Sequence, residues 1–407
     1  MAKALIYSRL YEWYFVHRRD LPWRETDDPY AIWLSEIILQ QTRVAQGLEY
    51  YRRFLQRWPT VRDLAAADEA EVLREWQGLG YYSRARNLHK AAKMIVERQK
   101  SKVESQEIPA YRFPRTFEEI RALPGVGDYT AGAIASFAYN LPYPAMDGNV
   151  YRVVARLFDI DEPFDTTAGK KLFHKKIEEL LDRDNPRLFN SAIMEFGALY
   201  CTPVLEAVSH QHSAVSHQHS AVSHQHSAGS HQHSAVSRCE SCPLADFCAA
   251  HAHGTAELLP VRKPRPKVRD RWFDYHIYLQ QSAVSIQPSE VYTLIRRRED
   301  PKDIWYHLYE FPCEESEGVQ NTEYRVQTDS VRTLSAERSV LCQPQAVCEL
   351  SHTLSHQRLH ARFIIYKVEE LPQIEGTIAV RWEELDDYAF SRLTLRAIDT
   401  LRTSLPH

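Results

Sequence analysis

Two carboxylic acids in this chain have neighbours that suit a catalytic pair. Glu36 lies among apolar residues at helical spacing, including Trp33 and Ile37. Such neighbours favour the neutral form of an acid and make it a usable proton donor near pH 7. Asp147 stands before Gly148-Asn149. The alternatives are a partly exposed position on a helix face for Glu36 and an ordinary Asx turn for Asp147.

Residues 123–133, between the two acids, read Leu-Pro-Gly-Val-Gly-Asp-Tyr-Thr-Ala-Gly-Ala and predict a turn that opens a helix. Glycine allows positive φ in such a turn, and the first amides of a helix bind anions. We therefore expect Gly125, Val126 and Gly127 to hold a backbone phosphate. An acid, a carboxylate and a phosphate clamp together indicate cleavage of a glycosidic bond on a nucleotide.

Length and charge limit the class of protein. A chain of 407 residues holds two or three domains that each bury a core. Its 50 basic and 54 acidic residues create no global cationic field, so nucleic-acid binding depends on local basic surface. The basic residues within 43–57 and 84–93 are candidates, although such charges are usually solvated helix surface. With no membrane-length apolar run and no signal-like start, we expect a soluble, cytoplasmic monomer that does not bind membranes.

Hydrophobic periodicity separates a helical part from a mixed part. Apolar residues recur at helical spacing from residue 4 to about 200, as in 31–54, 72–96 and 131–139. Beyond residue 272 the period changes to two, the spacing of half-buried strands. The predicted strands are 273–279, 291–297, 304–311 and 362–368, and a final helix is predicted over 391–404.

A repeat interrupts this organisation. Residues 209–236 are four tandem copies of Ser-His-Gln-His-Ser-Ala-Val, with Gly229 in place of one valine. We interpret them as a low-complexity insertion; opportunistic metal binding by the histidines and a heptad helix are the alternatives. The expected domains are a helical domain (1–200), a cysteine segment containing the repeat (201–250), a basic linker (251–271) and an α+β domain (272–407).

Several strings in this order resemble one family. They are Leu21-Pro22-Trp23-Arg24, residues 33–42, residues 78–88, residues 123–133, Asp147-Gly148-Asn149 and residues 195–199. They resemble the helix-hairpin-helix DNA glycosylase superfamily, and within it the MutY-type adenine DNA glycosylases, over most of residues 4–250. The resemblance implies a mainly α helix-hairpin-helix domain that removes adenine opposite 8-oxoguanine or guanine in double-stranded DNA.

Position 129 separates two branches of this superfamily. Lyases of the superfamily carry a lysine in the hairpin, because they need an amine to form a Schiff base. This chain has Tyr129 there. The resemblance is therefore to the monofunctional branch, which hydrolyses the glycosidic bond without cutting the strand.

The resemblance also implies a role for each site residue. An adenine in a duplex must be flipped out before it is attacked. Glu36 would then protonate a ring nitrogen of adenine, and Asp147 would stabilise the cationic sugar. The remaining roles concern positioning: Tyr129 and Asn149 orient the pair, Trp23, Arg24 and Glu195 line the adenine pocket, and Gln41 and Tyr81 are wedges that fill the space left by flipping.

Four cysteines resemble the ligands of a [4Fe–4S] cluster in this family: Cys201, Cys239, Cys242 and Cys248. A structural zinc site is the alternative, but five residues between the last two cysteines exceed its usual spacing. The repeat separates Cys201 from Cys239 much further than the family does. Because loop-closure entropy rises slowly with length, we expect the cluster to be retained.

The C-terminal part resembles the Nudix-like domain of this family. Residues 305–312 carry the resemblance, but no Nudix box with its metal-binding helix follows, so the domain is expected to recognise rather than hydrolyse. Residues 352–356 align with the loop that senses 8-oxoguanine. Leu354 replaces the family's aromatic residue, while Ser355 and His356 keep the ability to hydrogen-bond a base edge.

Other functions remain open at this stage. An endonuclease III-like glycosylase/lyase is disfavoured by Tyr129 and Glu36. A catalytically silent iron–sulfur DNA-binding protein is disfavoured by the intact pair of Glu36 and Asp147. A nucleotide-binding module built on the C-terminal domain is disfavoured by the absent Nudix box.

Overall fold

The computed structural model describes residues 2–100, 113–203, 235–264, 268–281, 291–316, 344–354 and 356–404. All but the last two residues of the His-rich repeat fall outside these ranges, as does Ser355. The chain divides into two compact units, Met1–Glu36 with Pro114–Pro264 and Ile37–Phe113 with Arg265–His407. Residues of the predicted helical domain thus contribute to both units, and the domain borders expected from the sequence remain predictions.

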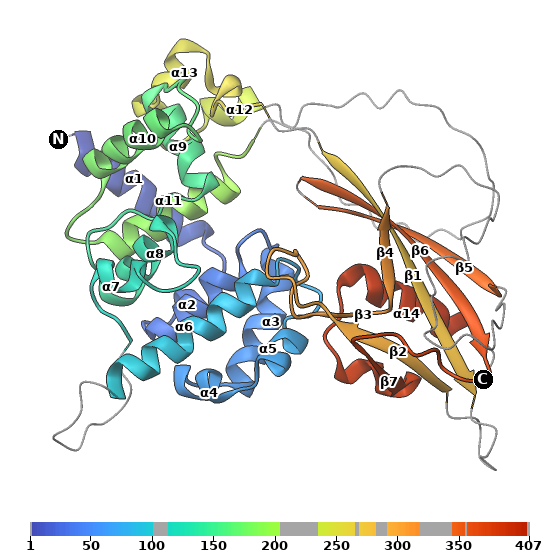
Figure 1. Ribbon diagram of the computed structural model, residues 1–407. Helices are drawn as coiled ribbons and strands as arrows, with labels where there is room; N and C mark the ends of the chain where they lie inside the picture. The colour runs from blue at the N-terminus through green and yellow to red at the C-terminus, as the bar shows by residue number, and fades with distance from the viewer. Residues whose placement is uncertain are drawn as a thin grey trace. The chain divides into compact units, whose positions relative to one another are not determined.

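The first unit is helical (Figure 1). Capping residues determine where two of its helices, α7 and α11, begin. Thr116 and Glu119 form a capping box at the start of α7, and Pro186 occupies the first turn of α11. The helices are α1 (Ala2–His17), α2 (Pro29–Ile38), α7 (Phe117–Arg121), α8 (Asp128–Tyr139), α9 (Gly148–Phe158), α10 (Thr167–Leu180), α11 (Pro186–Leu199), α12 (Ala235–Glu240) and α13 (Ala249–His253).

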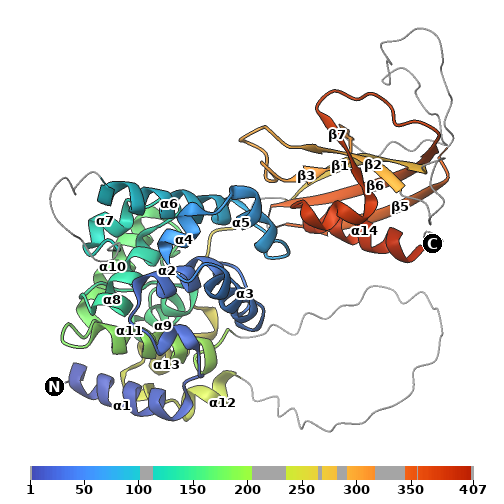
Figure 2. The ribbon, with the colours of Figure 1, turned by 90° about the horizontal axis from the view of Figure 1, so that it is seen from below.

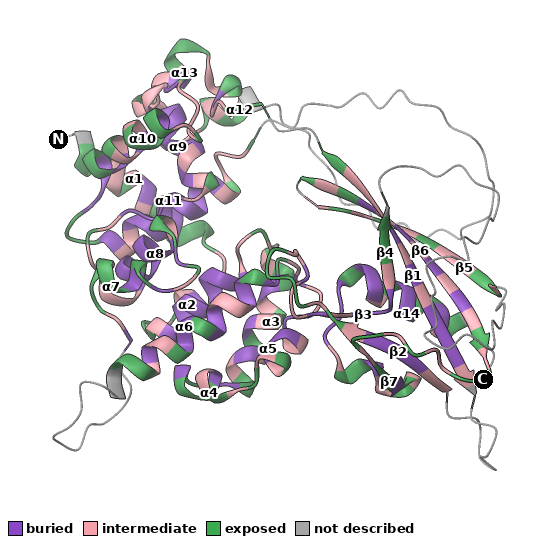
Figure 3. Cartoon of the chain, viewed as in Figure 1, coloured by how far each residue is buried: buried purple, intermediate pink, exposed green. Residues whose placement is uncertain are grey.

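Helices α8 and α11 form the centre of this unit, and both are drawn mostly as buried in Figure 3. Residues 130–137 of α8 are all buried, as are residues 189–197 of α11. A helix buried on every side shows little amphipathic pattern. Central helices of this kind give a rigid frame for side chains at their ends.

The helical part of the second unit contains α3 (Val44–Arg57), α4 (Val61–Ala66), α5 (Glu69–Glu75) and α6 (Ser83–Lys100). The stretches 31–54 and 72–96 are therefore not continuous helices. Gln41 interrupts the first with φ +56°, and Gly78, Gly80 and Tyr81 interrupt the second with φ between +47° and +96°. Left-handed backbone cannot continue a right-handed helix. The Gly-Leu-Gly string of residues 78–80 predicts the second break, and the apolar period did not reveal the first.

Seven described strands form one sheet in the second unit, with the order β3-β2-β1-β6-β5 (Figure 1). The long strands β1 and β6 pair in parallel, β4 pairs antiparallel with β1, and β7 with β2. The strands are β1 (Arg269–Gln281), β2 (Val291–Arg297), β3 (Tyr309–Glu310), β4 (Cys313–Ser316), β5 (Ala346–Thr353), β6 (Gln357–Val368) and β7 (Thr377–Arg381).

Alternate residues of β1 and β6 build the core of this sheet. Phe273 and Tyr275 of β1 are buried, as are Phe363 and Ile365 of β6. Helix α14 (Arg392–Ser404) lies beside the strands in both views (Figures 1 and 2) and buries its own apolar side chains. The predicted strand 304–311 is wrong for most of its length, because residues 301–307 form turns and only Tyr309–Glu310 pairs.

Among the helices of the described residues, none is long and apolar enough to cross a lipid bilayer.

Candidate active site

Glu36 lies in the last turn of α2 and is only 7% exposed. Its neighbours Trp33 and Ile37 are buried with it. Burial raises the pKa of the Glu36 carboxyl, and the charge of Asp147 adds to this effect. The hydrogen bond from Tyr129 and the charge of Arg24 oppose it in part. The net result is an acid that keeps its proton to higher pH than an exposed glutamate.

Tyr129 is the hydrogen-bond partner of Glu36. It stands at the second residue of α8, and its hydroxyl donates to Oε2 of Glu36 at 2.6 Å. Burial, together with the charges of Glu36 and Asp147, raises the pKa of Tyr129 well above its usual value. Tyr129 therefore stays a neutral donor whatever the state of the glutamate.

Asp147 is the N-cap of α9 and is partly exposed. Its Oδ1 accepts the backbone N–H groups of Asn149 and Val150 at 2.9 and 2.8 Å, and its Oδ2 accepts the Asn149 amide at 2.7 Å. Burial raises the pKa of Asp147, but these N–H donors favour the ionised form. Burial prevails in both residues, so the pKa of each acid is raised, but Asp147 has three N–H donors that stabilise its ionised form, where Glu36 has the single hydroxyl of Tyr129.

Arg152 extends this network away from the two acids. Its Nη2 donates to Oδ1 of Asn149 at 2.9 Å and to the Gly197 carbonyl at 2.6 Å, while its Nε donates to the Cys201 carbonyl at 2.7 Å. The side chain is buried on α9. Sequence reasoning missed Arg152, although an arginine one turn after Asn149 on an otherwise apolar helix face was a usable signal.

Of the three predicted pocket residues, Arg24 lies within electrostatic reach of Glu36. Trp23 is buried, and the charge of Arg24 acts on Glu36, Tyr129 and Glu195 alike. Glu195 is buried, and both of its oxygens accept hydrogen bonds from the Arg19 guanidinium, at 2.6 and 2.8 Å. Although burial acts in the opposite direction, these bonds lower the pKa of Glu195. Arg19 is a second residue that sequence reasoning missed.

In the turn between α7 and α8, one of the two glycines has the positive φ that is expected of a phosphate-binding turn. Gly125 has φ +77°, whereas Gly127 is extended and caps α8. The amide of Val126 already donates to the Leu123 carbonyl at 3.1 Å. The exposed amides of Gly125 and Gly127 are thus better placed to meet an anion than that of buried Val126.

The wedge candidates belong to the second unit. Gln41 is exposed in the turn after α2, and Tyr81 is 38% exposed in the turn before α6. Both have left-handed backbone, with φ +56° and +47°. The basic surface expected at 84–93 is wrong at Arg84, whose side chain is buried and donates to backbone carbonyls.

The four candidate cluster ligands are partly buried in the first unit, and none of them forms a disulfide. Burial raises the pKa of Cys242 to about 12, and charges on Cys201, Cys239 and Cys248 add to the effect. Among the described residues no three histidine, cysteine or acidic side chains stand at ion-ligand spacing. The four thiols nevertheless lie within electrostatic reach of one another, so the donor set fits a four-thiolate group by kind and proximity.

Contacts on both sides of the repeat hold the cysteine segment together. The Tyr200 hydroxyl donates to the Arg238 carbonyl at 3.1 Å, and Arg238 donates to the Thr202 hydroxyl at 3.3 Å. Arg156 donates to Sγ of Cys201 at 3.2 Å. The residues before and after the insertion therefore meet, as the slow growth of loop-closure entropy allows.

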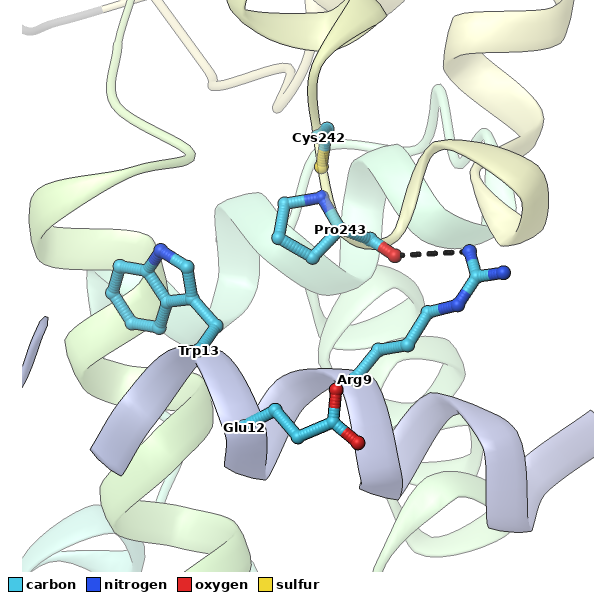
Figure 4. Close-up of a pocket in the computed structure, with 5 residues that line it drawn as sticks. All are labelled: Arg9, Glu12, Trp13, Cys242 and Pro243. Atoms are coloured by element: carbon cyan, nitrogen blue, oxygen red, sulfur yellow. Dashed lines mark hydrogen bonds between the residues drawn. The ribbon is translucent and has the colours of Figure 1, made fainter. Parts of the chain in front are cut away.

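A recess of about 320 Å³ lies beside Cys242, and Figure 4 shows it lined by side chains of α1 and the cysteine segment. Arg9 donates to the Pro243 carbonyl at 3.2 Å and to Asp246 at 2.6 Å across it. Glu36 and Asp147 do not line this recess. Its contacts tie α1 to the cysteine segment and are separate from the catalytic pair.

In the second unit, His352 and Thr353 end β5, Leu354 follows them, and His356 directly precedes β6. The amide of Leu354 donates to the Gln357 carbonyl at 2.7 Å, and the amide of Arg269 donates to the His356 carbonyl at 3.1 Å. Leu354 is partly buried and His356 is exposed. The predicted contribution of Ser355 lies outside the described residues.

The fold and the candidate site are those of a class of DNA repair protein whose family models match this chain. Residues 34–182 match the family described as HhH-GPD superfamily base excision DNA repair protein, and residues 283–400 match the NUDIX domain family. The predicted fold class, a helical helix-hairpin-helix domain followed by a Nudix-like α+β domain, is confirmed.

The relatives narrow this class. An adenine DNA glycosylase of Buchnera aphidicola subsp. Schizaphis graminum is 30% identical over 314 residues, covering 75% of this chain and 74% of that protein. One of Mus musculus is 43% identical over 213 residues, covering 50% of this chain. The chain belongs to the adenine DNA glycosylase family. It spans 39% of the mouse protein's length and 35% of that of the human relative.

A solved thermostable thymine-DNA glycosylase is also similar, with a TM-score of 0.47 at 24% identity, covering 62% of this chain and 97% of that one. A likeness of this degree carries no argument by itself.

Proposed function

We propose that this protein is a monofunctional DNA glycosylase that hydrolyses the N-glycosidic bond of adenine opposite 8-oxoguanine or guanine. The observation that carries the proposal is the buried Glu36, bonded to Tyr129 and electrostatically coupled to Asp147. Membership of the adenine DNA glycosylase family supports the choice of base. Because the substrate is genomic DNA, the proposed site of action is inside the cell.

The chemistry follows from the two environments. Neutral Glu36 gives its proton to a ring nitrogen of the flipped adenine, and the bond between C1′ and the base breaks with its electron pair leaving on the base. The positive charge left on the sugar is stabilised by ionised Asp147, which its three N–H donors hold in place. Water then adds at C1′, and its proton returns to Glu36.

Other side chains would position the substrate. Tyr129 holds the Glu36 carboxyl, and Asn149 holds that of Asp147. Trp23 and Arg24 would contact the adenine, and Glu195 would act through Arg19. The exposed amides of Gly125 and Gly127, at the N-terminus of α8, would bind a phosphate beside the flipped nucleotide.

We also propose that Cys201, Cys239, Cys242 and Cys248 hold a [4Fe–4S] cluster. When bound, such a cluster joins the ends of the cysteine segment by thiolate bonds and contributes to its folding. The N–H donors from Arg156 to Cys201 and from Leu244 to Cys242, at 3.2 and 3.4 Å, suit sulfur ligands that carry charge.

We also propose that the segment of residues 352–356 recognises 8-oxoguanine. Deleting residues 272–407 is a poor test of this role, because Tyr82 and Gln77 of the helical segment hydrogen-bond the backbone of Phe390. The substitution His356→Ala is sharper, since that side chain is exposed. It should reduce the preference for 8-oxoguanine over guanine and leave excision opposite guanine unchanged.

The test of the overall proposal is base release from three duplexes, with adenine opposite 8-oxoguanine, guanine or thymine. Release from the first two alone is expected. Borohydride should trap no protein–DNA adduct, because Tyr129 supplies no amine. A trapped adduct would favour the endonuclease III-like alternative, and tight binding without release would favour the silent DNA-binding protein.

A further inference from the structure

Arg84, in the first turn of α6, is a buried arginine whose hydrogen bonds connect two turns of the second unit. Its Nη1 donates to the carbonyls of Ile37, Ile38 and Gln40 at 3.0, 3.0 and 2.5 Å. Its Nη2 donates to the carbonyls of Leu79 and Gly80 at 3.3 and 3.1 Å. The first group of oxygens ends α2, and the second precedes α6.

These two turns carry the two wedge candidates. Gln41 directly follows one of the bonded carbonyls, and Tyr81 follows another. Both residues have the left-handed backbone that non-glycine residues rarely adopt. Such backbone persists only where the surrounding structure determines it, and it clusters at functional sites.

The guanidinium also contacts the Tyr81 side chain. Its Cζ lies 5.8 Å from the centre of the Tyr81 ring and 5.0 Å from that of Trp76. Trp76 in turn donates its indole N–H to the Gly80 carbonyl at 3.0 Å. The turn before α6 is thus fixed from two sides, and the ring of Tyr81 rests against the arginine while it remains exposed.

Burial of this charge is costly, and in the described part of the chain no carboxylate is paired with it in an ion pair. Desolvation lowers the pKa of Arg84 to about 10. The oxygens that its guanidinium contacts are backbone carbonyls and the Thr42 hydroxyl. Its two terminal nitrogens make all of these bonds, while the buried Nε has no hydrogen-bond partner among the described residues. An arginine bonded in this way serves the geometry of the backbone, because its planar fork reaches several oxygens that the single ammonium of lysine cannot.

We propose that Arg84 is a positioning residue that holds the turns 39–42 and 79–82 together and so presents Gln41 and Tyr81 as one paired wedge. The inference rests on the proposed function, since a wedge has a role only where a nucleotide is flipped. It adds a residue that contacts no DNA itself and determines how both wedge side chains are presented.

The test uses the full chain and a duplex in which 2-aminopurine replaces the target adenine. The fluorescence emission of 2-aminopurine rises when this base is extruded from the duplex. Arg84→Lys should lower extrusion, and single-turnover excision of adenine, on the order of 10- to 100-fold, because misplacement by about 1 Å has effects of this size. Duplex affinity should change much less, since phosphate contacts dominate it. Normal extrusion in a folded Arg84→Lys variant would overturn the proposal.

A double-mutant cycle separates positioning from general stability. Tyr81→Ala should also lower extrusion, and adding Arg84→Lys should lower it little further, because the two changes remove the same wedge. If the double variant instead lost extrusion by the product of the two single losses, Arg84 would act on stability alone. Unchanged extrusion in Tyr81→Ala would show that Tyr81 is not a wedge, and this result would contradict the proposal.

A second variant leaves the arginine intact. Gly80 has φ +73° and Gly376 has φ +75°, and an added Cβ would meet no atom within 4 Å at either position. Alanine therefore strains both turns equally. Gly80→Ala should reduce extrusion and Gly376→Ala should not, whereas equal effects would contradict the proposal.

The two readouts also separate this inference from the proposed function. Extrusion that depends on Arg84, without adenine release, would contradict the proposed function and leave the positioning role. Adenine release that is insensitive to Arg84→Lys would contradict the positioning role alone.

Discussion

The Tyr129 hydroxyl, at the start of α8, donates a 2.6 Å hydrogen bond to the buried carboxyl of Glu36, at the end of α2. This bond favours the ionised form of Glu36, while burial favours the neutral form and prevails. A side chain that only served packing would not need a hydroxyl here. The bond therefore fixes the orientation of the acid and moderates its pKa.

Tyr129→Phe tests this balance. Removing a bond that lowers the pKa of Glu36 raises that pKa further. In the proposed mechanism Glu36 acts in its protonated form. The fall of the single-turnover rate with rising pH should therefore occur at a higher pH in the variant than in the wild type. The acidic limb, set by Asp147, should move little. An alkaline limb that stays in place or moves to lower pH would contradict the assignment.

Glu36 should also make stability depend on pH. Its folded pKa is raised, so its contribution is fully present below the unfolded pKa and is lost as pH rises through the folded pKa. Glu36→Gln removes this titration. The Tm of the wild type should therefore fall more than that of the variant as pH rises above the ordinary pKa of a glutamate. Parallel Tm curves over this pH range would indicate that Glu36 is not sheltered from solvent.

Two substitutions separate the N-cap role of Asp147 from its proposed catalytic role. Asparagine keeps an N-cap oxygen for α9 but removes the charge, so Asp147→Asn should change stability little and still lose excision. Asp147→Ala also removes the cap, at a cost of about 1 kcal/mol in the free energy of unfolding. Denaturant unfolding and single-turnover assays measure the two effects. Retained excision by the asparagine variant would exclude a role for the charge.

The repeat can be removed as a test of the cysteine segment. Residues 200–202 and 238–241 contact each other on the two sides of the insertion. Deleting residues 209–236 should therefore leave iron and acid-labile sulfide content unchanged after anaerobic purification. Cys242→Ser is the matched variant that should lower both. Zinc without sulfide in the undeleted protein would contradict the cluster.

Local chemistry made much of the fold predictable. The alternation in β1 and β6 and the period of α14 are strong signals, and the structure has these elements where the pattern indicates them. Strands β4, β5 and β7 were missed. The few residues of β4 and β7 carry no clear period and pair only in the complete sheet, and none of the eight residues of β5 is buried. The Gly-Leu-Gly string of residues 78–80 predicts the break before α6, whereas the break at Gln41 was missed because glutamine does not signal left-handed backbone.

The candidate site was predictable where the residue type and its sequence neighbours together indicate a chemical role. Glu36 among apolar neighbours and Asp147 before Gly-Asn are such residues, and the structure places both in the same unit. Arg19, Arg84 and Arg152 were not assigned these contacts, because a buried arginine looks like any surface arginine in sequence. Their contacts join segments far apart in the chain, and only the fold reveals them.

The most direct test of the account is single-turnover release of adenine opposite 8-oxoguanine by the wild type and by Glu36→Gln, with duplex affinity measured beside it. The variant should bind the duplex as the wild type does and lose on the order of 100-fold or more in rate, the contribution of a general acid. Excision at the wild-type rate by Glu36→Gln would contradict the central claim.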